Sequence, residues 1–448
     1  MKSENLGQEK IRKLLFKQAT PAMIGMLVMS LYNVVDTIYI GRGVGTFALA
    51  GVSVSMPLII ILLSVSMAIG IGAASLVSRS LGAGNYEKVK EIFGNYLSLL
   101  FLVGIFAIVF GYVFLESING FFGASSDIFP YAIDYSKVLI LGAGFFLFSS
   151  SANNIIRASG NAKFAMSTML IGALVNLIFD PILIFYFKLG VRGAAYSTVF
   201  SWFISSLYVL YYYFRINTVK ISVKHLKFKI AIVKDIFAVG VSSFARQISA
   251  GIMTITVNIA LAKYGSSMII ASFGILSRIS MLTMMPIFGI VQGMQPIVGF
   301  NWGAKKFDRV KEVLFLSIKT STFLSFSSFF ILFLFSRQII SIFSSDKELL
   351  DFTNLAIKYI FIMLPLAGFQ GIASGLYQSI GKARPAFILS ILRQIILLVP
   401  LILILPIYYG LTGVLYSFPI ADFLASVITF IFIYREIKII NKLRKANI

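Results

Sequence analysis

Two related stretches of eleven residues decide the fold of this chain: GAGNYEKVKEI at residues 82–92 and GAKKFDRVKEV at residues 303–313. Five of the eleven aligned positions are identical and four more are conservative. Further pairs follow in nearly the same register: Gly160 with Gly381 and Gly193 with Gly413. Matches at one repeated spacing indicate an internal duplication, so the chain consists of two homologous halves.

The composition places both halves in a membrane. Of 448 residues, 58% are hydrophobic and only 12% are charged, with a mean hydropathy of +0.92, whereas a soluble domain carries about 25% charged residues. Cysteine is absent and His225 is the one histidine. These absences exclude disulfide frameworks, thiolate metal sites and almost every mechanism that depends on histidine.

Twelve apolar stretches have the length of a membrane helix, which needs about 20 residues. Their expected limits are 19–40, 47–78, 95–115, 137–156, 165–187, 194–214, 236–262, 268–298, 314–335, 359–380, 386–408 and 411–434. The expected fold class is an all-α polytopic membrane protein, with twelve transmembrane helices in two parallel-repeat six-helix bundles around a central cavity. Parallel repeats of this kind are typical of transporters.

The net charge of +22 is distributed as a topology signal. Most of the 39 Lys and Arg residues fall on one side of the predicted spans, which satisfies the positive-inside rule. We expect a multi-pass protein of the cell inner (plasma) membrane, in contact with membrane lipids and with both termini in the cytoplasm. The basic residues lack interleaved aromatic platforms, so no nucleic-acid partner is expected.

The duplication and the charge together predict the domain organisation. An N-terminal six-helix lobe at 1–214 and a C-terminal six-helix lobe at 236–448 are joined by a basic cytoplasmic linker at 215–235. Because six is an even number of spans, both lobes have the same orientation in the membrane.

Five short motifs follow one another along the chain: QATP at 18–21, NVVD at 33–36, GAG at 82–84, RASG at 157–160 and NLIFDP at 176–181. In this order, and with the two six-helix repeats, they resemble the multidrug and toxic compound extrusion (MATE) family, in its MepA-like bacterial branch. The resemblance covers essentially the whole chain. It implies drug efflux driven by inward flow of protons or sodium ions, through an outward-open to inward-open cycle.

Three acidic residues lie inside predicted spans: Asp36, Asp180 and Asp422. An Asp at a helix centre costs about 2.5–3.5 kcal/mol on the insertion scale, so each one needs a reason. Asp180 shares a helix face with Asn176, and Pro181 frees a backbone carbonyl nearby. Such oxygens suit a desolvated proton or Na+; the alternative is a proline-kinked helix whose Asp serves packing.

The resemblance maps a cation-coupling site onto six residues of the first half: Asp36, Asp180, Asn176, Thr198, Asn153 and Tyr32. The resemblance also allows a Na+ ion to bind at Asp36, Asp180 and Asn176. Alternatively, Asp36 only pairs with Arg42.

Two prolines are expected to have conformational roles, Pro21 and Pro181. Pro21 matches the family proline at which the first helix is proposed to bend. A position in a first helical turn, where no hydrogen bond is lost, is the equal alternative.

The second half lacks an equivalent carboxylate site, because none of the positions aligned with Asp36, Asp180 and Thr198 is acidic: they are Val257 or its neighbour Asn258, Pro400 or Leu401, and Phe418. The seventh and tenth predicted spans also contain no acid, whereas the sodium-coupled branch of the family that the chain resembles has carboxylates there. This departure favours coupling in the first half, and protons over sodium. In the second half we expect a structural ion pair between Arg393 and Asp422. The alternative is a cationic patch for an anionic substrate, formed with Arg246 and Arg278.

The expected function is secondary active multidrug efflux, in which hydrophobic or cationic small molecules leave by antiport with protons or Na+ through alternating access between the lobes. One alternative is a flippase or exporter of a lipid-linked precursor from a related superfamily. A membrane-embedded transferase is a weaker alternative, because its chemistry needs clustered acids or a histidine base. We expect no enzyme activity or catalytic residue, no cofactor or resident metal, and a monomer.

Overall fold

The computed structural model of this protein describes residues 3–216 and 223–446, and these residues form helices and turns without a strand. Within them, nine helices are long and apolar enough to cross a membrane, and two bent helix pairs bring the number to eleven. The longest candidate, Ala383–Ala446, has 64 residues, about three times the length that a single span needs. Its backbone breaks at Gly410 (φ 56°, ψ −138°), between the last two predicted spans.

The chain forms two compact units. Unit 1 contains Ile24–Phe244 and the N-terminal residues through Leu6; unit 2 contains Gly7–Met23 and Ala245–Ile448. The lobe limits 1–214 and 236–448 stay a prediction. The boundaries of the two units differ from these limits at two long helices. Helix α1 (Ile11–Gly43) begins in unit 2 and ends in unit 1, whereas α9 (Ile230–Tyr264) begins in unit 1 and ends in unit 2.

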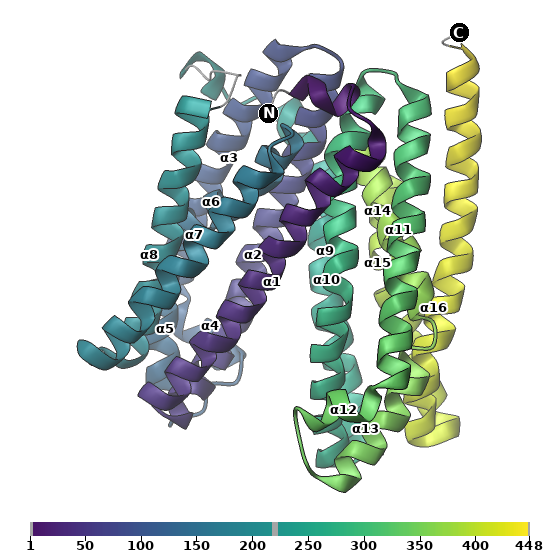
Figure 1. Ribbon diagram of the computed structural model, residues 1–448. Helices are drawn as coiled ribbons and strands as arrows, with labels where there is room; N and C mark the ends of the chain where they lie inside the picture. The colour runs from purple at the N-terminus through teal and green to yellow at the C-terminus, as the bar shows by residue number, and fades with distance from the viewer. Residues whose placement is uncertain (1–2, 217–222, 447–448) are drawn as a thin grey trace. The chain divides into compact units, whose positions relative to one another are not determined.

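The remaining elements follow the chain order (Figure 1). Those of the first half are η1 (Ser3–Gly7), α2 (Thr46–Gly82), α3 (Tyr86–Val113), α4 (Leu115–Phe121), α5 (Phe129–Leu141), α6 (Ala143–Ala158), α7 (Ala162–Pro181), η2 (Ile182–Tyr186), α8 (Gly190–Tyr211), η3 (Tyr212–Ile216) and η4 (Val223–Leu226). Those of the second half are α10 (Ser267–Gly303), α11 (Phe307–Leu334), α12 (Ser336–Ser341), α13 (Lys347–Ile360), α14 (Leu364–Ile380), α15 (Ala383–Ile391), η5 (Leu392–Leu398) and α16 (Val399–Ala446).

The backbone repeats the duplication that the sequence predicts. Six of the nine described residues with positive φ form pairs at the repeat spacing: Gly84 (φ 70°) with Lys305 (φ 55°), Gly160 (φ 87°) with Gly381 (φ 77°), and Gly190 (φ 59°) with Gly410 (φ 56°). Glycine adopts this conformation without steric cost, whereas a lysine is strained in it. Three breaks between helices therefore have a positive-φ residue at corresponding positions of the two halves, even where one glycine is replaced by lysine.

Small residues bring helices α7 and α8 of unit 1 close together (Figure 1). A Cβ atom on Gly172 of α7 would lie 2.7 Å from the Ser205 hydroxyl of α8. On the other side of α8, a Cβ atom on Gly142 would lie 2.5 Å from a methyl group of Val199. Glycine at these contacts lets α8 pack tightly between its neighbours, which positions the polar residues of α7 and α8 against each other.

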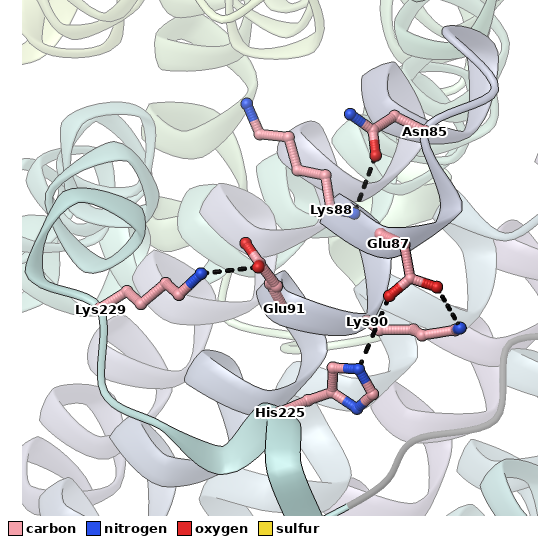
Figure 2. Close-up of polar contacts among 7 residues, drawn as sticks. All are labelled: Asn85, Glu87, Lys88, Lys90, Glu91, His225 and Lys229. Carbon is pink, nitrogen blue, oxygen red and sulfur yellow. Dashed lines mark hydrogen bonds and ion pairs between the residues drawn. The ribbon is translucent and has the colours of Figure 1, made fainter.

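The basic linker ends on helix α3, where the first of the two related stretches lies (Figure 2). The backbone N–H of Lys229 donates to the Asn95 side chain (2.5 Å), and the Lys229 ammonium contacts Glu91 (2.6 Å). The carbonyl oxygen of His225 lies so close to α3 that a Cβ atom on Gly94 would be 1.8 Å from it. These contacts fix the segment that leads into α9.

The second related stretch holds the segment that leads into α1. In unit 2, Lys306 donates to the carbonyl oxygen of Gly7 (3.0 Å) and Arg309 donates to that of Glu9 (2.7 Å). Arg309 also donates to Asn301 at the end of α10 (3.0 Å). Each copy of the stretch therefore binds the entry to one of the two helices that pass between units.

Candidate functional site

The centre of the candidate site is the side-chain amide of Asn176 on α7, which is 1% exposed. Its Nδ2 atom faces three oxygens: Asp180 Oδ1 at 3.4 Å, one turn later on α7, and Ser197 Oγ and Thr198 Oγ1 on α8, both at 3.3 Å. The (i, i+4) spacing places Asn176 and Asp180 on one helix face. The structure therefore brings together Asn176, Asp180 and Thr198.

The second carboxylate comes from α1. Asp36 is 8% exposed and Asp180 is 1% exposed, and their carboxyl groups lie close enough to interact. A hydrogen bond between the two groups requires that one of them carries a proton, because ionised carboxylates can only accept. Tyr32, one turn before Asp36 on α1, lies near both carboxyl groups.

Two further residues belong to the site and were not predicted from the sequence: Tyr135 and Ser197. Tyr135 on α5 is 2% exposed, hydrogen-bonds the side chain of Thr198 and lies near Asp36. Nothing in its neighbourhood in the sequence marks it, because only the packing of α5 on α8 brings it to the site. Ser197 has a marker in the sequence, because the pair Tyr196-Ser197 recurs in the second half as Tyr416-Ser417.

Asn153 is not joined to these residues by any described contact. Its Oδ1 atom is buried and has no hydrogen-bond partner among the described residues. Its neighbour Asn154 accepts a hydrogen bond from Arg157 (2.7 Å), a buried guanidinium at the end of α6. A role for Asn153 in cation coupling stays a prediction.

Asp36 does not pair with Arg42. Among the described residues Asp36 forms no ion pair, and Arg42 is exposed near the end of α1. The alternative of a simple surface ion pair is therefore not what the structure contains, and the partner of Asp36 is the carboxyl group of Asp180.

Each predicted conformational proline lies in the body or at the end of a helix. Pro181 is the last residue of α7 and is followed by the π-helical segment η2. Pro21 is the eleventh residue of α1, so its placement in a first helical turn is wrong. It leaves the carbonyl of Lys17 without its helical donor, two residues before α1 passes from unit 2 to unit 1 at Met23. Whether either proline acts in transport stays a prediction.

The donor set of the site fits a hard cation or a proton. Three of its oxygens are buried without a hydrogen-bond partner in the described residues: Asp36 Oδ1, Asp180 Oδ2 and Asn176 Oδ1. A buried polar atom without a partner costs free energy, so these oxygens are poised to bind something. Carboxylate and amide oxygens are ligands that Na+ and other hard cations accept, and they also accept hydrogen bonds from a protonated carboxyl group.

The equivalent positions in unit 2 form a hydrophobic cluster. The counterparts of Asp36, Tyr135 and Thr198 at the repeat spacing are Val257, Ala356 and Phe418, and all three belong to one buried cluster. Leu401, the counterpart of Asp180, packs against the same cluster. One fold thus carries a polar site in its first copy and an apolar core in its second.

Asp422, the acid within a predicted span of the second half, has a different environment. Arg393 donates to both carboxylate oxygens of Asp422, with Nη2 at 3.2 Å from Oδ2. Gln370 donates to the Asp422 carbonyl oxygen (3.1 Å). Arg246 and Arg278 form no ion pair within the described residues. That Arg393 and Asp422 act structurally stays a prediction, as does the alternative of a cationic patch.

Known proteins resemble the chain over its full length. A family model described as MatE matches it twice, at residues 21–182 and 243–404. The multidrug export protein MepA of Staphylococcus haemolyticus (strain JCSC1435) is 29% identical, covering 97% of this chain and 96% of that protein. MepA of Staphylococcus aureus (strain MSSA476) is 28% identical with the same coverage.

Solved structures agree in fold. The outward-facing conformation of a multidrug resistance MATE family transporter of the MOP superfamily superposes with a TM-score of 0.92 at 28% identity, covering 99% of each chain. A MATE structure in the bent conformation has the same TM-score at 27% identity, covering 100% of this chain and 99% of that one. The family consists of transporters and not of enzymes. Since its model matches both halves, this chain belongs to the MATE (MatE) family of multi-pass membrane transporters.

Proposed function

We propose that this protein exports hydrophobic and cationic small molecules by antiport with protons, with Na+ as the alternative coupling ion. The exported compounds follow from the relatives named multidrug export proteins. Alternating access follows from the two parallel repeats. The monomeric state and the cytoplasmic location of both termini are part of the proposal.

The observation that carries the coupling proposal is the carboxyl pair of Asp36 and Asp180 in unit 1. The pair is buried and touches the Asn176 amide. An intramembrane acid is costly and marks a functional site by default. The apolar cluster at the equivalent positions of unit 2 supports a single coupling site, located in the first half.

The contact between two carboxyl groups favours protons as the coupling ion. Two ionised carboxylates this close repel each other, and a proton shared between them relieves the repulsion. Proton binding at one group then depends on the charge of the other, so the pair titrates as a unit. Na+ would satisfy the same oxygens in a different way, by replacing the proton with a coordinated cation.

Dye efflux from vesicles that contain the purified protein tests this proposal. An inward proton gradient and, separately, an inward sodium gradient are imposed on the wild type, Asp36→Asn and Asp180→Asn. We expect the proton gradient to drive efflux by the wild type, and both substitutions to reduce that efflux to the background of empty vesicles.

Asp127→Asn is the matched control, because it makes the same chemical change at an exposed residue outside the site. It should transport as the wild type does. Efflux unaffected by both site substitutions would overturn the assigned site. A response to sodium alone would reverse the choice of ion.

A further inference from the structure

Ser197 is a fully buried hydroxyl on α8 that meets Asn176 at two points. Its Oγ donates to the Asn176 backbone carbonyl oxygen (3.2 Å) and accepts from the Asn176 side-chain Nδ2 (3.3 Å). A hydroxyl group has a single hydrogen to donate. The same hydroxyl also lies within reach of the Asp180 carboxyl group. With its hydrogen donated to the backbone carbonyl of Asn176, Ser197 presents only lone pairs to the side-chain amide.

These lone pairs decide which way the Asn176 amide points. Its NH2 group faces oxygens of Ser197, Thr198 and Asp180, all within 3.4 Å. A flip of the amide would place Oδ1 against the lone pairs of Ser197 and the carboxylate of Asp180, which is repulsive. Asn176 Oδ1 therefore points away from them, and it is buried without a hydrogen-bond partner in the described residues, like Asp36 Oδ1 and Asp180 Oδ2.

The direction of this amide determines what it can bind. An amide oxygen coordinates Na+ or accepts a hydrogen bond from a protonated carboxyl group, whereas an amide NH2 group does neither. We propose that Ser197 is a positioning residue of the cation site, which holds the Asn176 amide so that its oxygen is available to the coupling cation. This inference rests on the proposed function, since it assumes that the Asp36 and Asp180 pair binds that cation.

Ser201 is a control on the same helix. It lies one turn after Ser197 on α8, is 5% exposed, and its hydroxyl donates to the backbone carbonyl of Thr198 (2.7 Å). A Ser→Ala change there removes the same atom from the same buried helix without touching Asn176. A role of Ser197 in helix packing alone would be matched by Ser201.

The test measures cation binding to the full-length purified protein through its thermal unfolding midpoint, titrated with Na+ at fixed pH and with protons at fixed Na+. A ligand that binds the folded state raises this midpoint with concentration. Substitution of a residue that orients a ligand group typically weakens metal affinity about 10–100-fold. We therefore expect Ser197→Ala to raise the half-saturating concentration of the cation that stabilises the wild type about tenfold, Ser197→Thr to restore most of the affinity, and Ser201→Ala to change it less than about twofold.

A second background separates orientation from other effects. In Asn176→Asp both ends of the side chain are oxygens, so its direction no longer matters. If this background keeps a cation response, we expect Ser197→Ala to add less than about a twofold change to it. If it loses the response, the comparison of Ser197→Ala, Ser197→Thr and Ser201→Ala decides alone.

Failure of the inference and failure of the proposed function give different results. If Asp180→Asn abolishes the cation response while Ser197→Ala leaves it unchanged, Ser197 does not position the site and the proposed function stands. If Ser197→Ala and Ser201→Ala weaken the response equally, the role of Ser197 is packing. A response that Asp36→Asn and Asp180→Asn both leave unchanged overturns the cation site and the role of Ser197 with it.

Discussion

Asp180 and Asp422 are both acids inside the membrane, and their neighbours give them opposite properties. Asp422 meets a guanidinium, which neutralises it and satisfies both its carboxylate oxygens. Asp180 meets another carboxyl group and an amide, and it retains a buried oxygen without a described partner. The paired charges of Asp422 and Arg393 do not favour binding of a further cation. The environment of Asp180 does favour cation binding.

The Arg393–Asp422 pair should matter for stability and not for coupling. Breaking a buried ion pair by removing one partner typically costs about 3–5 kcal/mol. The Arg393 side chain is 36% exposed and solvent screens its charge, so we expect Asp422→Asn to cost less than that range, about 2 kcal/mol. The measurement is the folded yield and the thermal unfolding midpoint in detergent.

Replacement of both partners supplies the control for the ion pair. The double variant Arg393→Met with Asp422→Leu leaves no buried charge unpaired, and such replacements are often neutral. It should recover most of the folded yield, and proton-driven dye efflux per folded molecule should stay near that of the wild type. Normal yield of Asp422→Asn with lost coupling would contradict a structural role.

At the scale of elements, the two related stretches act as anchors for the segments that enter α1 and α9. Glu91 of the first stretch contacts the basic linker (Figure 2), together with the Asn95 amide that follows it on α3. The second stretch uses cations to hold backbone carbonyls before α1. The two similar stretches therefore have the same structural role, which is to hold the segment before a long helix, although the chemistry of each contact differs. Both anchored helices pass from one unit to the other.

The substitution Gly94→Ala, which adds one methyl group, tests the contact between Gly94 and the linker. In Gly94→Ala the Cβ atom would lie 1.8 Å from the carbonyl oxygen of His225, so η4 must move away from α3. Overpacking of this kind costs about 1–3 kcal/mol. We expect a lower unfolding midpoint and faster tryptic cleavage after Lys227, measured by time-resolved proteolysis of the purified protein.

Gly104→Ala is the control on the same helix. A Cβ atom there would lie 3.5 Å from its nearest neighbour, which is an ordinary contact. Both substitutions raise the helix propensity of α3 by about 1 kcal/mol, so only the clash distinguishes them. Equal cleavage rates for the two variants would show that the linker does not depend on this contact.

At the scale of the whole molecule, the predicted orientation follows from charge alone. Lys and Arg concentrate on the predicted inner side, and such a bias sets topology because basic segments stay in the cytoplasm. The absence of cysteine allows a direct test. Ser125→Cys, in a predicted outer loop, and Lys445→Cys, near the C-terminus, each introduce one exposed thiol.

A membrane-impermeant maleimide distinguishes the two sides. We expect Ser125→Cys to be labelled in intact cells, and Lys445→Cys only after the cells are permeabilised. The cysteine-free parent chain measures background labelling. Labelling of Lys445→Cys in intact cells would reverse the orientation and move the basic linker to the outer side.

The membrane fold, the duplication and the acids of the site could be predicted because each leaves a local or periodic trace. Spans appear as apolar stretches, since lipid tolerates few charges. The repeat appears in paired glycines, because a turn with positive φ restricts the residue that can occupy it. Asp36 and Asp180 stand out as isolated acids within such stretches.

The contacts among the residues of the site could not be predicted from the sequence, because they depend on tertiary structure. The contact of Asp36 with Asp180 depends on where α1 lies against α7, and Tyr135 reaches Thr198 because α5 packs on α8. The passage of α1 and α9 between units has no marker in the sequence. Composition and period record what each segment must avoid in lipid, whereas the neighbours of a side chain depend on packing between segments far apart in the chain.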